Sequence, residues 1–422
     1  MVNTRRIASA VRAGLVLGAC LLGCVSPARA LTTSDKPASI LVWPKIIVDT
    51  NSALQSRPTD TIIELGNVNT SSVKQAHCFY INANSHCSEA AAEPGKVCLG
   101  PSDCPLPGVT APTGPNASCV PGWSEIDFDV KITPEQPLQW RASTGLARKD
   151  FPLPDAGLCT NHPDQSCNPS SSVNTCGGAG VCAVVPSNAG SGVPPTPEDP
   201  FVGTLKCIQF DPNSNPPAPD QGSGHNALIG AALIEETTTP SVDLQRYNAV
   251  GVTHLNDVES NPGQVQLDGT QYATCASTLI LNHIFDNAPD PLDSEGASST
   301  GVTTDLTLVP CGDDFLRQDP GNATAQYLVF NEFEQRLSTS RKVDCFFERQ
   351  LSLIDTNTST RSIFSFNVQG TLVGQTRIRG VGGASTGHGL LGVALTDING
   401  SGVGYNLQQS GNNSGIDIIT IP

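Results

Sequence analysis

Hydrophobic positions along the chain recur mainly with a period of two. Apolar residues at 126, 128, 130 and 132 alternate with charged residues at 127, 129 and 131. Leu306 and Leu308 alternate with Asp305 and Thr307 in the same way. This period is typical of strands with one apolar face and one solvated face. No segment keeps a convincing helical period over three turns, so the pattern predicts a mostly β-strand protein.

Three other segments add to this prediction. Residues 39–48 form a β-branched run that Pro44 interrupts. Because proline donates no hydrogen bond to a ladder, we expect an edge strand or two short strands there. Residues 227–236 are the best helix candidate, although a strand fits them equally well. Residues 416–421 predict a terminal strand whose edge can pair with a neighbouring chain.

Two stretches of similar pattern suggest a diverged internal repeat. Residues 61–69 and 73–81 read as one hairpin, with Cys78 on its second strand. Residues 326–331 and 341–349 read as another, with Cys345 on its second strand. Each is followed by a Gly-Thr-Leu segment, at 203–205 and 370–372. The repeat predicts an all-β fold of two tandem immunoglobulin-like β-sandwiches, although unrelated hairpins also look alike.

The first thirty residues have the pattern of a signal peptide. Arginines at 5, 6 and 12 precede a short apolar core at 15–25, and Ala28-Arg29-Ala30 fits a cleavage site. We therefore expect a signal peptide at 1–30, a first sandwich at 31–255 and a second at 256–422. Alternatively, Leu21-Leu22-Gly23-Cys24 resembles a bacterial lipobox, which would place a lipid anchor on Cys24. No later stretch is apolar enough for a transmembrane helix.

Charge narrows the range of partners. The whole chain has a formal charge of −16. Removing the leader takes away four arginines and leaves 19 basic against 39 acidic residues, a charge of −20. Such an acidic chain is unsuited to nucleic acid or anionic lipid. The charge maintains solubility, or it binds divalent cations.

The cysteine count points to disulfides. Fifteen cysteines become thirteen after cleavage at Ala30, and an exported chain of this kind uses them as disulfides. Eight lie in two Pro/Gly/Ser-rich inserts of the first sandwich, at about 84–122 and 155–198, which have too few apolar residues to order themselves by packing. They are Cys87, Cys98, Cys104 and Cys119 in one insert and Cys159, Cys167, Cys176 and Cys182 in the other. Four cysteines allow three connectivities, and the sequence chooses none.

Five cysteines lie outside the inserts. Cys78 and Cys207 are on predicted strands of the first sandwich and can bridge it. Of the rest, we expect Cys275 to pair with Cys311, which leaves Cys345 as a free thiol.

The two cysteine groups, and above all Gly177-Gly178-Ala179-Gly180-Val181-Cys182, resemble the disulfide-rich spacers of exported bacterial proteins. The flanking strands resemble the immunoglobulin-like β-sandwich domains of such proteins. The resemblance implies an envelope or extracellular protein, but it implies no activity and no functional residue.

Several motifs suggest chemistry, and each also has a plain structural interpretation. His77-Cys78 and His86-Cys87 offer zinc or copper ligands at a spacing that matches no usual site. Gly383-Ala384-Ser385-Thr386-Gly387 has the form Gly-x-Ser-x-Gly, followed by His388. The residues after it look like a strand, whereas a nucleophile elbow needs a helix. A glycine-rich hairpin loop explains the same residues.

Two acidic loops and three tryptophans are candidate ligand sites. Residues 211–215 and 286–295 carry oxygen side chains that suit calcium, but neither has the EF-hand pattern. Solvated acidic loops are the commoner case. Trp43, Trp123 and Trp140 can stack on a glycan, although core packing is the default.

The sequence therefore predicts a non-catalytic exported protein for adhesion, assembly or matrix structure, without a cofactor unless calcium binds. It can associate with itself or with a surface polymer. A calcium- or glycan-binding sandwich is the alternative, and a secreted serine hydrolase that uses Ser385 is a third.

Overall fold

The structure is a computed structural model. It describes residues 32–108, 115–146, 157–167, 176–184, 192–211, 218–219, 226–238, 241–256, 263–291, 301–382 and 387–422. These residues form mainly antiparallel sheets with a few 3-10 turns and one short helix, α2 (Phe366–Gln369). The all-β class predicted from the period-two pattern is confirmed. An immunoglobulin-like identity and the domain boundary at residue 255 stay predictions. Among the described residues, no helix is long and apolar enough to cross a membrane.

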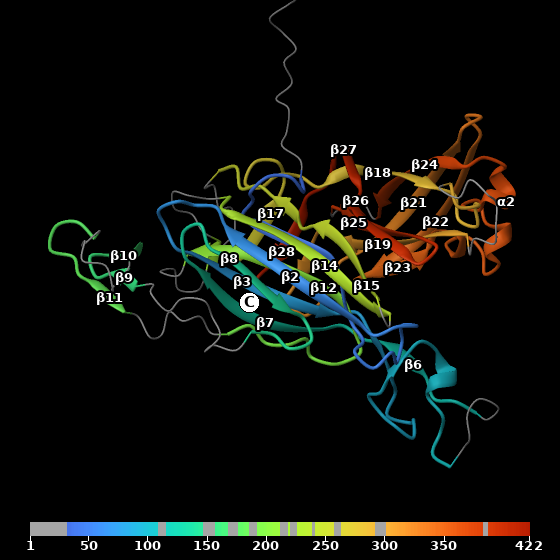
Figure 1. Ribbon diagram of the computed structural model, residues 1–422, viewed down its shortest axis with the longest axis horizontal. Coiled ribbons are helices and arrows are strands. Elements are labelled where there is room, and N and C mark those ends of the chain that lie inside the picture. Colours follow the sequence, from blue (N-terminus) through green and yellow to red (C-terminus); the bar gives the residue numbers. More distant parts are fainter. Residues whose placement is uncertain are drawn as a thin grey trace, which may run out of the picture. The chain divides into compact units, whose positions relative to one another are not determined.

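Two sheets enclose the first core (Figure 1). One has the order β16 (Val250–Val252), β1 (Ile40–Val48), β12 (Phe201–Asp211), β3 (Lys74–Asn82), β7 (Ser124–Ile132), and β13 (Ala218–Pro219) pairs with β12. The other has the order β15 (Ser241–Asn248), β14 (Leu228–Thr238), β2 (Thr59–Asn67), β8 (Pro137–Arg141). Trp43 and Trp140 are buried between them, and their indole N–H groups donate to the Ala231 carbonyl at 2.9 Å and the Tyr80 hydroxyl at 2.7 Å. These two tryptophans belong to the core, so they offer no face to a glycan.

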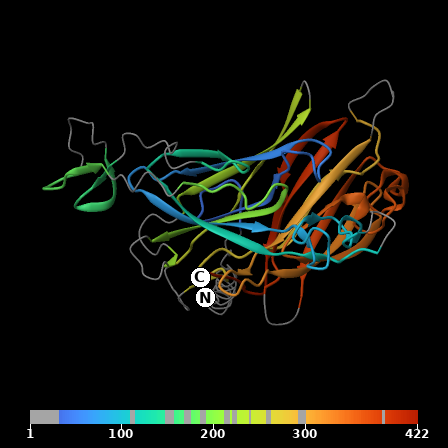
Figure 2. The ribbon, with the colours of Figure 1, turned by 90° about the horizontal axis from the view of Figure 1, so that it is seen from below.

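Two further sheets enclose a second core, whose strands are orange and red in Figure 2. The first has the order β22 (Arg336–Asp344), β21 (Asn322–Asn331), β24 (Val373–Val381), β18 (Ala276–Ile284), β27 (Gln408–Asn412). The second has the order β23 (Phe347–Gln350), β19 (Val302–Pro310), β25 (Leu390–Ile398), β26 (Ser401–Asn406). Leu279, Leu306, Tyr327 and Ile378 are among the side chains that fill this core.

The C-terminal strand lies inside a small sheet. β28 (Asp417–Thr420) runs antiparallel to β17 (Gln264–Leu267) and parallel to β20 (Asp313–Asp314). The terminal strand expected at 416–421 is therefore present, but the expectation of a free edge is wrong. Both edges of β28 already have partners within the same chain, so this strand is not available to a neighbour.

Each cysteine-rich insert contains its own three-stranded sheet. The first has β4 (Ser85–Cys87), β5 (Val97–Cys98) and β6 (Cys119–Pro121), with a 3-10 turn at Pro101–Asp103. The second has β9 (Gly157–Cys159), β10 (His162–Cys167) and β11 (Cys182–Val184). Cysteines form most of the small core in both inserts.

Two predictions about individual elements are wrong. β1 is one strand in the interior of its sheet, because its pairing with β12 skips Pro44 through a register shift between Trp43 and Ile46. The missing N–H of Pro44 thus falls where the ladder needs no donor. The first copy of the repeat is not a hairpin, since β2 and β3 belong to opposite sheets, whereas β21 and β22 do pair directly. The ambiguous segment at 227–236 is a strand, as part of β14.

Candidate functional site

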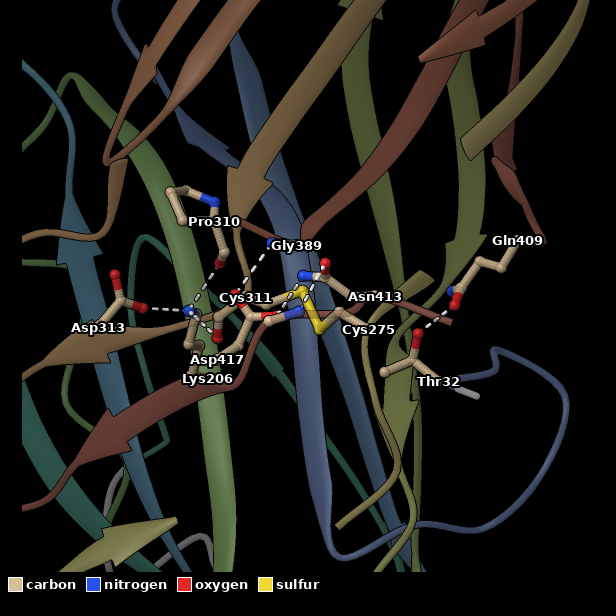
Figure 3. The surroundings of a disulfide bond; sticks show 11 residues. Thr32, Lys206, Cys275, Pro310, Cys311, Asp313, Gly389, Gln409, Asn413 and Asp417 are labelled. Atoms are coloured by element: carbon tan, nitrogen blue, oxygen red, sulfur yellow. Dashed lines mark hydrogen bonds and ion pairs between the residues drawn. A yellow bond between two sulfur atoms is a disulfide. The ribbon is translucent and has the colours of Figure 1, made fainter. Parts of the chain in front are cut away.

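Buried polar groups gather around the disulfide that joins Cys275, just before β18, to Cys311, just after β19 (Figure 3). The amide of Cys311 donates to the Gly389 carbonyl at 3.0 Å, and the amide of Asn413 donates to the Cys275 carbonyl at 3.0 Å. Asp417, at the start of β28, accepts from the Gly389 amide at 2.9 Å and from Asn413 Nδ2 at 3.0 Å. Burial raises the pKa of the Asp417 carboxyl above its usual range.

Lys206 lies on β12, in one of the two sheets around the first core, and its side chain extends to this disulfide. Its Nζ atom forms an ion pair with Asp313 of β20 and donates to the Pro310 carbonyl at 3.1 Å. The Cys311 carbonyl lies 3.5 Å from the same nitrogen. The two charged side chains are 1% and 3% exposed, so water does not solvate them. Because isolated charges are costly to bury, Lys206 and Asp313 depend on each other.

A second ion pair joins the sheets around the first core to a sheet of the second core. Lys45 of β1 lies 2.8 Å from Glu348 of β23. Burial alone would lower the pKa of Lys45, but the carboxylates of Glu348 and Asp305 outweigh it, so the pKa is raised. Burial raises the pKa of Asp305, and Lys45 opposes that rise. Asp305 was expected on a solvated face of its strand, but that face is covered by the sheets around the first core.

We use the term junction for the four charged residues Lys45, Lys206, Asp313 and Glu348 together with the Cys275–Cys311 disulfide. Its charged atoms face one another or backbone carbonyls, and its sulfur atoms are bonded together. Cys275, Cys311 and Asp417 lie close enough to hold a metal ion, but disulfide sulfurs are not the thiolates that bind metals. The junction can therefore fix the sheets to each other, and it presents no free nucleophile.

The structure assigns all of the predicted disulfide candidates. Cys78 and Cys207 are opposite each other on β3 and β12 and are bonded, and Cys275 is bonded to Cys311 as expected. In both inserts the first cysteine pairs with the third and the second with the fourth. The pairs are Cys87–Cys104, Cys98–Cys119, Cys159–Cys176 and Cys167–Cys182.

Cys345 is the one described cysteine without a disulfide, as the sequence suggested. It follows β22 and is half-buried. Burial, and then the carboxylate of Asp313, raise the pKa of its thiol far above the ordinary value. A thiol that resists deprotonation is a poor nucleophile and a poor metal ligand.

The His-Cys pairs do not assemble into a His/Cys cluster. Both thiols belong to disulfides, and both imidazoles lie against carboxylates. His77 Nδ1 is 2.7 Å from Asp129 Oδ1, and His86 Nε2 is 3.0 Å from Glu198 Oε2.

The suspected nucleophile Ser385 lies outside the described residues. His388 is described, and its Nδ1 is 3.3 Å from the Asn322 carbonyl. The neighbouring glycine has a packing role, because a Cβ atom on Gly389 would lie 2.4 Å from the Cys275 Cβ and 2.6 Å from Asp417 Oδ2. Close packing on the disulfide therefore explains the glycine at position 389.

The two acidic loops are only partly described. Of the first, the side chain of Asp211 and residues 212–215 are outside the description. In the second, Asp286 is buried and accepts from the amides of Thr304 at 2.9 Å and Ser352 at 2.8 Å. Burial raises the pKa of Asp286 to about 6. Asp290 bonds to Asn399, and Asp293 and Glu295 lie outside the described residues. Backbone amides and the Gln350 side chain, 3.3 Å away, thus occupy the carboxylate of Asp286.

A cavity of about 570 Å³ opens beside β2, β8, β14 and β15. Its polar lining includes Glu64 and Arg246, which form an ion pair at 2.7 Å, together with Gln139 and Asn248. Leu65 and Ile229 are among its apolar residues. Sequence patterns could not predict this cavity, because Glu64 and Arg246 are 182 residues apart.

Comparison with known proteins finds no family model that matches the chain and no curated protein that matches it in sequence. The fold and the contacts described above therefore carry the functional argument.

Proposed function

We propose that this chain is a non-catalytic exported protein that serves in adhesion, assembly or matrix structure outside the cell. The observation that carries the proposal is the junction. Its charged side chains and its disulfide are all used to hold sheets together. Six disulfides in one chain are typical of proteins that fold in an oxidising compartment, which supports export.

The proposal is tested with an epitope-tagged chain produced in its own cell. We expect the protein in the medium or at the surface, where protease added from outside removes it. We also expect that deletion of the gene weakens attachment or aggregation of the cells. Protein that stays inside the cell, or fluorophosphonate labelling that disappears in a Ser385→Ala variant, would contradict the proposal.

The cavity beside Glu64 and Arg246 favours glycan binding as a second candidate function. Its volume lies within the range of small-ligand sites, and polar and charged groups line it beside apolar ones. A glycan array probed with the wild-type chain and an Arg246→Ala variant tests this candidate. Binding that the variant loses supports it, and an array without any signal removes it.

A further inference from the structure

One face of this acidic protein is basic. β22 and β24 flank β21, and their outward side chains include exposed Arg336, Lys342, Arg377 and Arg379. We call these four residues the basic face. Lys342 forms an ion pair with Asp344 at 2.8 Å, and the three arginines form no ion pair with a described residue. These charges come from two separate segments, so no basic run is visible in the sequence.

The basic face also has an apolar part. Register places Arg377 opposite Leu328 and Arg379 opposite Gln326 on β21. Leu328 and Phe330 are only half-buried on the same side of the sheet, and the guanidinium carbon of Arg377 lies 5.2 Å from the Phe330 ring centre. Arginine beside an aromatic ring is enriched where proteins meet partners.

The complementary surface lies on β7, the edge strand of a different sheet. Its outward side chains are Glu125, Asp127 and Asp129, followed by the half-buried Lys131. We call the three carboxylates the acidic face. The side chains of Asp127 and Asp129 are 63% and 55% exposed. His77 of β3 lies beside both aspartates. Burial, and then Asp127, raise the pKa of Glu125 to about 7, so Glu125 adds less than a full negative charge to the face at neutral pH.

The two faces match in spacing as well as in sign. Arg377 and Arg379 are alternate residues of one strand, and so are Asp127 and Asp129. Alternate residues on a strand are about 6.8 Å apart, so two guanidiniums can meet two carboxylates at once. Two basic faces repel each other, and so do two acidic faces, which leaves the unlike contact as the favourable one.

From this match we infer that the basic face of one copy docks on the acidic face of a second copy. The inference rests on the proposed role in assembly and names the partner as the chain itself. Because the two faces belong to different sheets of one chain, the contact is heterologous. Each docked copy still presents one free face of each sign, so the contact can repeat along a chain of copies.

Charge reversal tests the inference with disulfide-intact protein. The basic-face variant is Arg377→Glu with Arg379→Glu, and the acidic-face variant is Asp127→Arg with Asp129→Arg. A matched control, Lys36→Glu with Arg361→Glu, makes the same charge change at exposed positions that lie on none of β7, β22 and β24. Sedimentation velocity at increasing concentration measures association in about 20 mM and 500 mM salt, because exposed ion pairs are screened at the higher value.

We expect the wild type and the control to associate at low salt, with the association at least tenfold weaker at high salt. Each reversed variant alone should associate at least tenfold more weakly than the control. An equimolar mixture of the two variants should associate again, because each supplies the sign that the other lacks. Association that neither variant weakens would overturn this interface and leave the role in assembly standing. A mixture that fails to associate, or a wild type that stays monomeric at low salt, would also overturn it, and the export and attachment test then decides the proposed function separately.

Discussion

The pair formed by Lys206 and Asp313 offers the sharpest test of the junction. Lys206→Met keeps most of the volume of the side chain and removes its charge. The carboxylate of Asp313 would then stay buried with only the Gly321 amide, 3.0 Å from its Oδ1 atom, as a described donor. The carbonyl of Pro310 would also lose the Nζ donor that lies 3.1 Å away.

Both side chains are almost fully buried, so the loss should be large. Breaking a buried ion pair by removing one partner costs about 3–5 kcal/mol. Asp313→Asn should cost less, because Lys206 keeps the backbone carbonyls as acceptors. The double variant should be more stable than the sum of the single effects predicts, by about 2 kcal/mol, since it leaves no unpaired charge.

Guanidinium unfolding of the oxidised protein, followed by tryptophan fluorescence, measures these differences. Lys342→Met is the matched control, because its exposed pair with Asp344 should contribute about 0.5 kcal/mol or less. If Lys206→Met changes the unfolding free energy no more than Lys342→Met does, the pair does not hold the junction and the reasoning is refuted.

Three further outcomes follow from buried groups. Gly389→Ala should lower the unfolding free energy by about 2 kcal/mol or more, because the new Cβ would lie 2.4 Å from the Cys275 Cβ. Gly100→Ala is the control: its Cβ would have nothing within 4 Å, so the unfolding free energy should change by less than about 0.5 kcal/mol. Equal effects of the two variants would contradict close packing at Gly389. Cys345 should react with a thiol reagent far more slowly in the folded than in the unfolded protein, because burial raises the pKa of its thiol. Equal reaction rates at pH 8 would show that the Cys345 thiol is accessible in the folded protein. Burial lowers the pKa of His283 from 6.5 to about 4. Between these two pH values the imidazole is protonated in the unfolded chain but neutral in the folded chain, so the folded state loses stability as the pH falls. Between pH 7 and pH 4, His283→Gln should therefore gain about 3 kcal/mol relative to the wild type in unfolding experiments, and a constant difference across that range would count against a buried neutral His283.

Local patterns predicted much of the fold, because strand periodicity is a local property. β7 has the expected alternation, with Phe128 and Val130 buried and Asp127 and Asp129 exposed. The alternating pattern predicted solvent exposure wrongly where another sheet covers the polar side of a strand. Asp305 and Thr307 look solvated in the sequence, yet both lie in a strand that is covered on each face. No residue near them in the sequence carries the information that Lys45 will lie against Asp305.

Some of the disulfides could also be predicted from local sequence patterns, and others could not. Cys78 and Cys207 could be paired in advance because each lies on a recognisable strand. The insert pairings were left open, since those segments have no strong strand pattern to fix which cysteines meet. The junction was missed for another reason: Lys206 and Asp313 are 107 residues apart, and a lone lysine inside an apolar strand gives no sign of its partner. The basic face was missed because two separate strands, β22 and β24, supply it.

Peptide mapping under non-reducing conditions can establish whether this is an exported, cross-linked β-protein. The protein is recovered from outside the cell that makes it. We expect linked peptides for the six pairs Cys78–Cys207, Cys87–Cys104, Cys98–Cys119, Cys159–Cys176, Cys167–Cys182 and Cys275–Cys311. We also expect Cys345 as an alkylated free thiol. Protein found only inside the cell with its cysteines reduced, or a Cys345 that is linked to one of these residues, would contradict the proposal of an exported, cross-linked protein.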